Sequence, residues 1–243
     1  MTASTPGAPT VVLVHGAFAD SSSWNGVIRD LQGAGHRVVA VANPLRGLHA
    51  DAEYLRGVLD SLDGPIVLAG HSYGGSVMSE AADGHPDVRA LVYVASFILE
   101  EGESTSQLAG RFPGAQLGAA LDTVPVPLPG GGTATDLSIR QEEFRKVFAA
   151  DVPEDVTDLM AATQRPITSA ALDEPATRAA WRTIPSWNLV TTDDLAIPAA
   201  AMRFMGERAG AHTVEVTASH AVTVSRPDAV AALIDEAARA TAG

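Results

Sequence analysis

The segment around Ser72 offers the clearest chemistry in the sequence. Residues 65–75 read PIVLAGHSYGG, an apolar run followed by Gly70-x-Ser72-x-Gly74 and then by residues suited to a helix. In a chain with 22 glycines the pattern alone is weak evidence, but between a strand and a helix it places a serine on a tight, strained turn. The flanking glycines leave room for neighbouring elements. We therefore predict that Ser72 is a nucleophile beside a helix N-terminus, which favours negative charge.

A serine hydroxyl needs a base to take its proton, and His220 is the histidine best placed for that role. In the chain order serine, acid, histidine, only His212 and His220 of the seven histidines come late enough. His212 stands at the entry of a predicted strand, where we expect it merely to be exposed. His220 follows the carboxyl end of that strand, where catalytic groups gather in parallel sheets.

An acidic side chain should orient the imidazole and stabilise its charged form. Asp193 and Asp194 are adjacent at the end of the predicted strand 187–190. Neighbours on an extended chain point in opposite directions, so only one of them can serve. Glu100 and Glu101, which follow another strand, are a further alternative, and the residues by themselves leave the choice open.

Two backbone N–H groups are needed to hold the oxyanion of an acyl-transfer intermediate. One is that of Tyr73, directly after the nucleophile. The other should come from the loop after the first strand, where Gly16 lets the backbone approach and Ala17, or alternatively Phe18, donates. We expect His15 to be buried and to hold this loop.

A substrate pocket would be lined by apolar and aromatic side chains near the nucleophile. His71, next to the serine, is expected to be structural or to line this pocket. The candidates are Phe18, His71, Phe97, Leu108, Phe112, Met160 and Trp181. The chemistry requires neither a metal nor an organic cofactor, and no cluster with metal-ligand spacing stands out in the sequence.

The elements that must position these residues alternate between strand and helix. Continuous apolar runs are typical of strands buried on both faces of a parallel sheet. The expected strands are 11–15, 38–41, 66–69, 90–94, 187–190 and 213–216. The expected helices are 23–32, 50–62, 73–82, 199–208 and 227–240. This alternation predicts an α/β fold of about six mostly parallel strands flanked by helices.

Residues 99–184 interrupt this rhythm before the penultimate strand. We expect short helices over 136–149 and 153–164, preceded by a loop. The loop is indicated by Pro125, Pro127, Pro129 and Gly130–Gly132. An insertion of this length between two sheet strands favours a cap over an active site, with a second domain as the alternative. We assign 1–98 and 185–243 to the core and 99–184 to the cap.

Composition limits the partners. The 243 residues are 46% hydrophobic and 19% charged, which suits one packed domain or one core with an insertion. A formal net charge of -13 disfavours nucleic acid and anionic membrane surfaces. The first ten residues lack the features of a signal peptide, and the chain has no cysteine. We expect a cytoplasmic protein with a small-molecule partner and leave a homodimer open.

Taken together, these stretches resemble the α/β-hydrolase superfamily. The likeness is nearest to small bacterial esterase-like members related to plant hydroxynitrile lyases and hormone methylesterases. It is carried by residues 12–18, 43–47, 70–75, 192–198 and 219–222. In similar sequences the acid lies four residues before a proline, which here is Asp194 before Pro198. The resemblance therefore implies a triad of Ser72, Asp194 and His220 on an α/β-hydrolase fold.

The resemblance also implies ester hydrolysis. Hydroxynitrile lyases of this type look to need a lysine after the catalytic histidine and a threonine in the first loop, where this chain has Ala221 and Gly16. Both departures favour a carboxylesterase-like enzyme acting on a small or medium ester. Other chemistry on the same triad is the alternative, namely a lactonase, amidase, C–C hydrolase or perhydrolase. A ligand-binding protein of low turnover is a third hypothesis.

Overall fold

The computed structural model describes residues 8–128 and 130–242, and its centre is a parallel sheet of six strands. The order across the sheet is β2-β1-β3-β4-β8-β9, and every neighbouring pair is parallel. The strands are β1 (Thr10–Val14), β2 (Arg37–Val41), β3 (Ile66–His71), β4 (Val88–Val94), β8 (Ser186–Thr191) and β9 (His212–Val216). The predicted fold class is confirmed. Residues 1–7, Pro129 and Gly243, about which the sequence also made predictions, lie outside the described residues.

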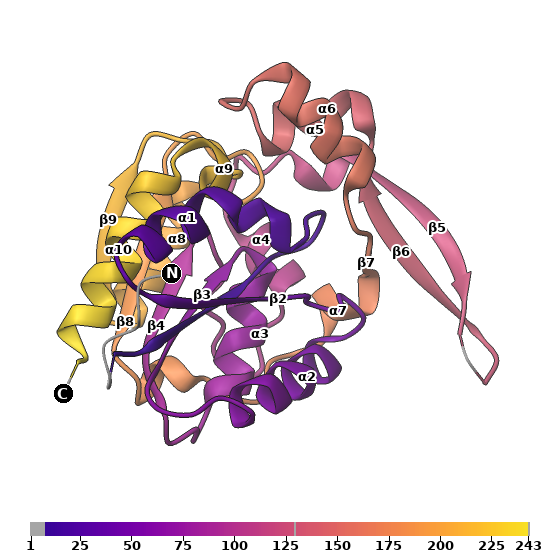
Figure 1. The fold of residues 1–243 in the computed structure, drawn as a ribbon. Coiled ribbons are helices and arrows are strands. Elements are labelled where there is room, and N and C mark those ends of the chain that lie inside the picture. The colour runs from indigo at the N-terminus through magenta and orange to yellow at the C-terminus, as the bar shows by residue number, and fades with distance from the viewer. Residues whose placement is uncertain (1–7, 129, 243) are drawn as a thin grey trace.

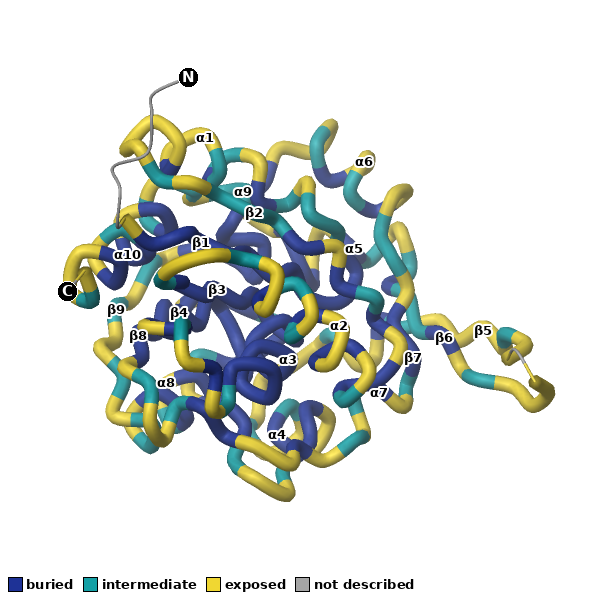
Figure 2. The backbone as a smooth tube through the Cα atoms, turned by 60° about the horizontal axis from the view of Figure 1, so that its bottom comes forward, coloured by how far each residue is buried: buried dark blue, intermediate teal, exposed yellow. Residues whose placement is uncertain are grey.

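Helices cover both faces of this sheet (Figure 1). In Figure 2, α1 and α10 lie on one side of the strands and α2, α3 and α8 on the other. These helices are α1 (Asn25–Gly33), α2 (Leu48–Asp60), α3 (Tyr73–Ala82), α8 (Ala199–Arg208) and α10 (Pro227–Ala240). Two short helices, η1 (Ser21–Trp24) and α9 (Val222–Ser225), precede α1 and α10. The result is a three-layer sandwich, as strand–helix alternation requires.

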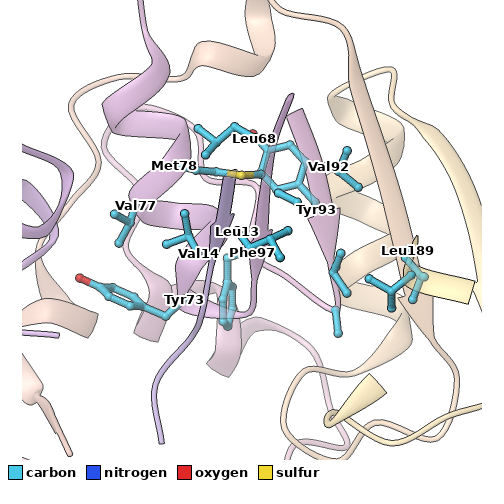
Figure 3. Packing of buried hydrophobic residues seen from close by; sticks show 14 of the residues in the cluster. Leu13, Val14, Leu68, Tyr73, Val77, Met78, Val92, Tyr93, Phe97 and Leu189 are labelled. Atoms are coloured by element: carbon cyan, nitrogen blue, oxygen red, sulfur yellow. The ribbon is translucent and has the colours of Figure 1, made fainter. Parts of the chain in front are cut away.

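Burial along each strand follows its place in the sheet. β1 and β3 are buried at every residue, whereas the outermost strands, β2 and β9, are partly exposed. Because a central parallel strand is covered on both faces, its sequence is continuously apolar, as in TVVLV of β1. Figure 3 shows side chains of α3 and of the central strands gathered into one cluster, among them Leu13, Leu68 and Met78.

The segment between β4 and β8 contains a second, antiparallel sheet of order β5-β6-β7. Its strands are β5 (Leu121–Pro127), β6 (Thr133–Ile139) and β7 (Ile167–Thr168). The remaining elements are α4 (Thr105–Arg111), η2 (Leu117–Ala120), α5 (Gln141–Phe148), α6 (Glu154–Thr163), α7 (Ser169–Asp173) and η3 (Ala180–Arg182). β5 and β6 project from the body as a long hairpin (Figure 1). Whether 99–184 acts as a cap stays a prediction.

Two sequence predictions inside this segment are wrong. Pro125 and Pro127 lie in β5 and not in a loop, and only residues around Gly130–Gly132 form the turn. Proline is tolerated there because β5 is an edge strand, where an N–H facing solvent needs no partner. The helix expected from residue 136 begins at Gln141, because residues 136–139 pair with β5 instead. The expected helix over 153–164 is α6.

No helix in the described residues is both long and apolar enough to span a membrane.

Two helix-interior glycines form a matched pair for testing the packing. A Cβ at Gly206 of α8 would overlap Nδ2 of Asn188 in β8, whereas a Cβ at Gly57 of α2 would meet no atom within 4 Å. Gly206→Ala should therefore lower the free energy of unfolding by about 1–3 kcal/mol. Gly57→Ala should raise it by roughly 0.5–1 kcal/mol, because only helix propensity changes. Urea denaturation measures both, and equal effects would contradict the close contact of α8 with the sheet.

Candidate active site

Ser72 is the single residue between β3 and α3. Its backbone has φ 53° and ψ -124°, a left-handed region that non-glycine residues rarely adopt. The flanking glycines are required by contact: a Cβ at Gly70 would lie 2.7 Å from the backbone of Gly74, and a Cβ at Gly74 would overlap the carbonyl oxygen of Val14. The strained turn predicted from the sequence is thus present.

Contacts that the sequence analysis missed hold this turn in place. The hydroxyl of Ser96, just after β4, donates to the Ser72 carbonyl oxygen at 2.6 Å. The N–H of Gly75 donates to the same oxygen at 3.0 Å. A Cβ at Gly75 would overlap the Ser96 side chain and lie 2.7 Å from the carbonyl oxygen of Phe97. The second glycine of the Gly74-Gly75 pair was the available signal, since a pattern of glycines beyond GxSxG indicates a further close contact.

His220 and Asp194 meet in the interior. Nδ1 of His220 lies 2.7 Å from Oδ2 of Asp194, and both side chains are almost fully buried. Oδ2 also accepts a hydrogen bond from the Thr191 hydroxyl at 2.8 Å. Oδ1 accepts from the N–H groups of Ala196 and Ile197, each at 2.8 Å. Because every lone-pair direction is used, the carboxylate can stay ionised while buried and can fix the ring so that Nδ1 carries a proton.

The other acid candidates are placed elsewhere. Asp193 is exposed, and its backbone N–H donates to the carbonyl oxygen of Ala218 at 3.2 Å. Glu100 forms an ion pair with Arg182 at 2.6 Å, and Glu101 is exposed. Of the four carboxylates that the sequence left open, Asp194 is the one that contacts the imidazole. The two aspartates differ because they lie in the turn that follows β8, which ends at Thr191, and only Asp194 is buried there.

The second ring nitrogen of His220 is available for proton transfer. Within the described part of the chain, Nε2 is buried and has no hydrogen-bond partner. The backbone carbonyl of His220 accepts a hydrogen bond from Nε2 of His71, the residue before Ser72, at 2.9 Å. The Ser72 hydroxyl makes no hydrogen bond to the His220 ring among these residues, so the serine–histidine contact stays a prediction. In unliganded enzymes this contact often forms only when substrate is bound.

His71 is a structural residue. It is buried between the His220 ring, with centroids 4.7 Å apart, and the ring of Phe148 in α5. Burial lowers the pKa of His71 to about 3, so the ring is neutral and donates to the His220 carbonyl without adding charge. Phe148 also packs edge-on against the His220 ring, with centroids 4.9 Å apart. Through Phe148, the inserted segment thus packs against the ring of the proposed base, His220.

The loop after β1 passes close to Ser72. A Cβ at Gly16 would lie 2.7 Å from Cβ of Ser72, which shows how closely the backbones approach. Among the described residues, the N–H groups of Ala17 and Tyr73 donate to no protein acceptor. The N–H of Phe18 donates to the carbonyl oxygen of Arg165 at 3.2 Å. The alternative prediction, in which Phe18 is the donor, is therefore wrong, because its N–H already donates to the Arg165 carbonyl oxygen.

His15 holds this loop, as predicted. Its Nε2 accepts from the N–H of Asn43 at 3.0 Å, and its Nδ1 lies 2.9 Å from the carbonyl oxygen of Gly16, to which it donates. Asn43 in turn donates through Nδ2 to the His15 carbonyl oxygen. Burial lowers the pKa of His15 to about 4, which keeps the ring neutral and able to accept. Asn43 was not singled out from the sequence.

A cavity of about 450 Å³ opens beside Ser72 and is mostly apolar. Two of the predicted pocket residues, Phe18 and Phe97, line it. The residues that line it without having been predicted as pocket residues come largely from the inserted segment and from the loop after β8. They are Ala17, Ser72, Tyr73, Thr105, Ser106, Ala109, Gly110, Ala115, Leu117, Gly118, Ala119, Leu121, Leu137, Ser169, Leu172, Asp173, Ala196 and Ile197. Small residues dominate this lining, and the pocket prediction considered only large apolar and aromatic side chains and His71.

The other five predicted pocket residues do not line this cavity. Trp181 donates through Nε1 to the Leu99 carbonyl oxygen, and the ring of Phe112 packs against that of Phe204 with centroids 5.6 Å apart. Leu108 is buried in the core cluster, and His71 lies beneath the His220 ring.

Met160 of α6 lines a separate groove, which Phe18 also lines. Leu108, Phe112, Met160 and Trp181 were predicted from their apolar or aromatic character, and His71 from its position beside Ser72, where the structural role that was its alternative is the one observed.

The hydroxyl of Tyr73 points away from the cavity. It donates to Oδ2 of Asp51 in α2 at 2.9 Å, and both side chains are buried. Asp51 also accepts from the N–H of Arg46, while burial raises the pKa of its carboxyl and of the Tyr73 hydroxyl. The Tyr73 side chain therefore anchors the start of α3 to α2.

Comparisons with known proteins agree with this fold. A family model described as the alpha/beta hydrolase family matches residues 11–233. The pyrethroid hydrolase of Sphingobium wenxiniae is 32% identical over 96% of this chain and 88% of its own length. Methylesterase 8 of Arabidopsis thaliana is 33% identical over 42% of each chain. Among solved structures, polyneuridine aldehyde esterase superposes with a TM-score of 0.81 over 94% of this chain and 98% of its own, at 19% identity.

The contrast between Asp194 and Asp193 gives a direct test of the site. Asp194→Asn should lower kcat by about 10⁴-fold, because an amide oriented by Thr191 and two N–H groups favours the wrong imidazole tautomer. Asp193→Asn removes a charge of the same sign from the adjacent, exposed position and should leave kcat within about twofold. Steady-state hydrolysis of p-nitrophenyl acetate measures both. A damaging Asp193→Asn with a harmless Asp194→Asn would overturn the assignment.

Buried His15 predicts a loss of stability in acid. Its pKa is about 4 in the folded protein against 6.5 for an ordinary histidine, so between these values the unfolded chain binds more protons. The free energy of unfolding should therefore fall with pH from about 6.5 downward, by at most ~1.4 kcal/mol per pH unit for this group. Urea denaturation between pH 7.5 and 4.5 should show a shallower fall for His15→Gln, while His212→Gln, at an exposed position, keeps the wild-type slope. Identical slopes for wild type and His15→Gln would contradict the prediction.

Proposed function

The chain belongs to the alpha/beta hydrolase family, and from this premise we propose that it is a serine hydrolase that cleaves a small or medium carboxylic ester through an acyl-enzyme on Ser72. The family and the named relatives make it a carboxylesterase-like hydrolase. The roles of individual residues and the size class of the ester are the proposed part.

The proposal is carried by the buried pair of Asp194 and His220. A carboxylate with all its oxygens hydrogen-bonded holds Nδ1 of the ring, and the opposite nitrogen, Nε2, has no partner in the described residues. Nε2 of His220 is one of eight such buried polar atoms among the described residues, and the one on a ring that a buried carboxylate holds, so it calls for an explanation. Proton transfer from Ser72, which directly follows β3, supplies one.

The reaction proceeds in two halves. Oγ of Ser72 attacks the ester carbonyl carbon while Nε2 of His220 takes its proton, and Asp194 stabilises the resulting imidazolium. The negative oxygen of the tetrahedral intermediate accepts hydrogen bonds from the N–H groups of Ala17 and Tyr73. Tyr73 is the first residue of α3, whose N-terminus favours negative charge. The carbon–oxygen bond to the alcohol then breaks, and His220 protonates the leaving oxygen.

The second half repeats the first with water. His220 takes a proton from a water molecule, whose oxygen attacks the acyl carbon of the ester to Ser72. The second tetrahedral intermediate uses the same two N–H groups. Its collapse returns the proton to Oγ of Ser72 and releases the carboxylic acid. The two proton transfers that involve Ser72 require its hydroxyl to come within hydrogen-bonding distance of Nε2 once substrate is bound.

Two observations support an ester of small or medium size. The cavity beside Ser72 has a volume of about 450 Å³, within the range of small-molecule sites. The relatives include a pyrethroid hydrolase that matches 96% of the chain, and a carbendazim hydrolyzing esterase and a plant methylesterase that match 46% and 42% of it. The cytoplasmic location and the absence of nucleic-acid partners stay predictions.

A fluorophosphonate probe and p-nitrophenyl acetate together test the proposal. Wild-type protein should be labelled at Ser72 and should turn over the ester continuously. Ser72→Ala should lose labelling and lower kcat by about 10⁴-fold or more, because the nucleophile is gone. Ser61→Ala, an exposed serine in the turn after α2, serves as the matched control and should behave as wild type.

Two results would contradict the proposal. Labelling at another residue, with activity retained in Ser72→Ala, would overturn the assignment of Ser72 as the nucleophile. Labelling at Ser72 with one equivalent of p-nitrophenol and no further turnover would favour the ligand-binding alternative. Lactone, amide and peracid assays on the wild-type protein distinguish the other reactions that the same residues could perform.

A further inference from the structure

The cavity beside Ser72 is almost free of charge. Twenty residues in the described part of the chain line it, and Asp173 is the one with a formally charged side chain. None of the twenty is a lysine, an arginine or a histidine. A bound carboxylate or phosphate would therefore lose its hydration without gaining a cationic partner, which is unfavourable.

Asp173 faces the cavity from the short helix α7. Ser169, Leu172 and Asp173 all line the cavity, and their spacing of three and four residues places them on one face of the helix. Leu172 is half-buried and Asp173 is exposed, so the carboxylate stands at the rim while the leucine lies deeper. The helix faces α4 across the cavity, because α4 supplies Thr105, Ser106, Ala109 and Gly110 to the same lining.

The charge of Asp173 is not compensated by its neighbours. Within the described residues its carboxylate has no ion pair and no hydrogen bond. The adjacent Glu174 is engaged elsewhere, because it accepts from the N–H of His49 at 3.2 Å. The nearby cation Arg46 is paired with Asp136 at 2.7 Å, and Arg111, which ends α4, stacks on the ring of Phe204.

We propose, on the basis of the ester-hydrolase function above, that this cavity selects esters that are neutral or carry a cationic group, such as a quaternary ammonium, and rejects anionic esters. Asp173 is the residue that sets the preference. A cation entering the rim meets an unpaired carboxylate, whereas an anion meets a like charge. The formal net charge of -13 acts in the same direction on the approach of the substrate.

The same arrangement favours release of product. Hydrolysis converts an uncharged ester group into a carboxylic acid, which gives up a proton to water near neutral pH. The carboxylate formed has no cation to bind in the cavity and faces Asp173 on its way out. We therefore expect weak inhibition by the product acid, with an inhibition constant well above the KM of the parent neutral ester.

Three p-nitrophenyl esters of matched size separate charge from shape. One acyl chain ends in trimethylammonium, the second in a tert-butyl group of the same shape, and the third in a carboxylate. At low salt we expect kcat/KM for the cationic ester to exceed that for the neutral one by roughly two- to fivefold, as is usual for a partly exposed charge pair. The anionic ester should be the poorest. In 0.5 M NaCl the ratios should approach one, because salt screens exposed charges.

Variants assign the preference to one residue. Asp173→Asn should bring the cationic-to-neutral ratio close to one, and Asp173→Lys should reverse the order of the charged esters. Asp63→Asn, which removes the same charge from an exposed turn after α2, should keep the wild-type ratio. The ratio is read within each variant, so a general loss of activity does not disturb it.

The outcomes are distinct. Equal kcat/KM for the three esters in the wild-type protein, or an unchanged ratio in Asp173→Asn, would overturn the proposal. Should the variants fail to fold, a wild-type ratio that does not respond to salt would overturn it as well. Failure of the wild-type protein to hydrolyse even the neutral ester would instead contradict the ester-hydrolase function on which the proposal rests.

Discussion

The structure depends most on the backbone conformation of Ser72. A serine at positive φ is unfavourable by itself, and it persists because its surroundings leave no other arrangement. The Ser72 carbonyl is held by the Ser96 hydroxyl and the Gly75 N–H, while Gly74 lies against the carbonyl of Val14. Three parallel strands, β1, β3 and β4, therefore have to be in register before the hydroxyl can stand at the sheet edge. Phe18, Leu45 and Ala95 also adopt positive φ, so Ser72 is one of four such non-glycine positions among the described residues, and the one that the proposed chemistry uses as nucleophile.

The second requirement is an ionised carboxylate in a dry interior. Asp194 meets it through two backbone N–H groups, one threonine hydroxyl and the imidazole itself. Such a set of donors resists rotation of the carboxylate, so the ring of His220 has one orientation and one tautomer. His71 and Phe148 pack against the other sides of that ring. The proposed base is thus positioned by β8, β3 and α5, elements that are far apart in the chain.

The cavity adds a constraint of a different kind, because it exists where large side chains and most polar groups are missing from the lining. Alanines and glycines of α4 and of the segment before β5 leave the space open, and polar anchors are few. Recognition in such a site comes from shape and from the rare charge, here the carboxylate of Asp173. An acidic protein with a single acidic group at the mouth of an apolar cavity is suited to taking in uncharged molecules and expelling acids.

Local patterns determined a large part of this protein. Continuous apolar runs indicated the parallel sheet, the glycines around Ser72 indicated the strained turn, and the family pattern before Pro198 selected Asp194. The first two features depend on residues close together in the chain, whereas the choice of Asp194 came from the resemblance to the α/β-hydrolase superfamily. Tertiary structure alone decided that the N–H of Phe18 donates to the Arg165 carbonyl oxygen and that Ser96 supports the turn at Ser72. It also decided which small residues enclose the cavity. Tertiary structure also placed Pro125 and Pro127, which were expected in a loop, in the edge strand β5. These outcomes rest on contacts between distant segments, and no residue carries in its own type the identity of the neighbour that folding will bring to it.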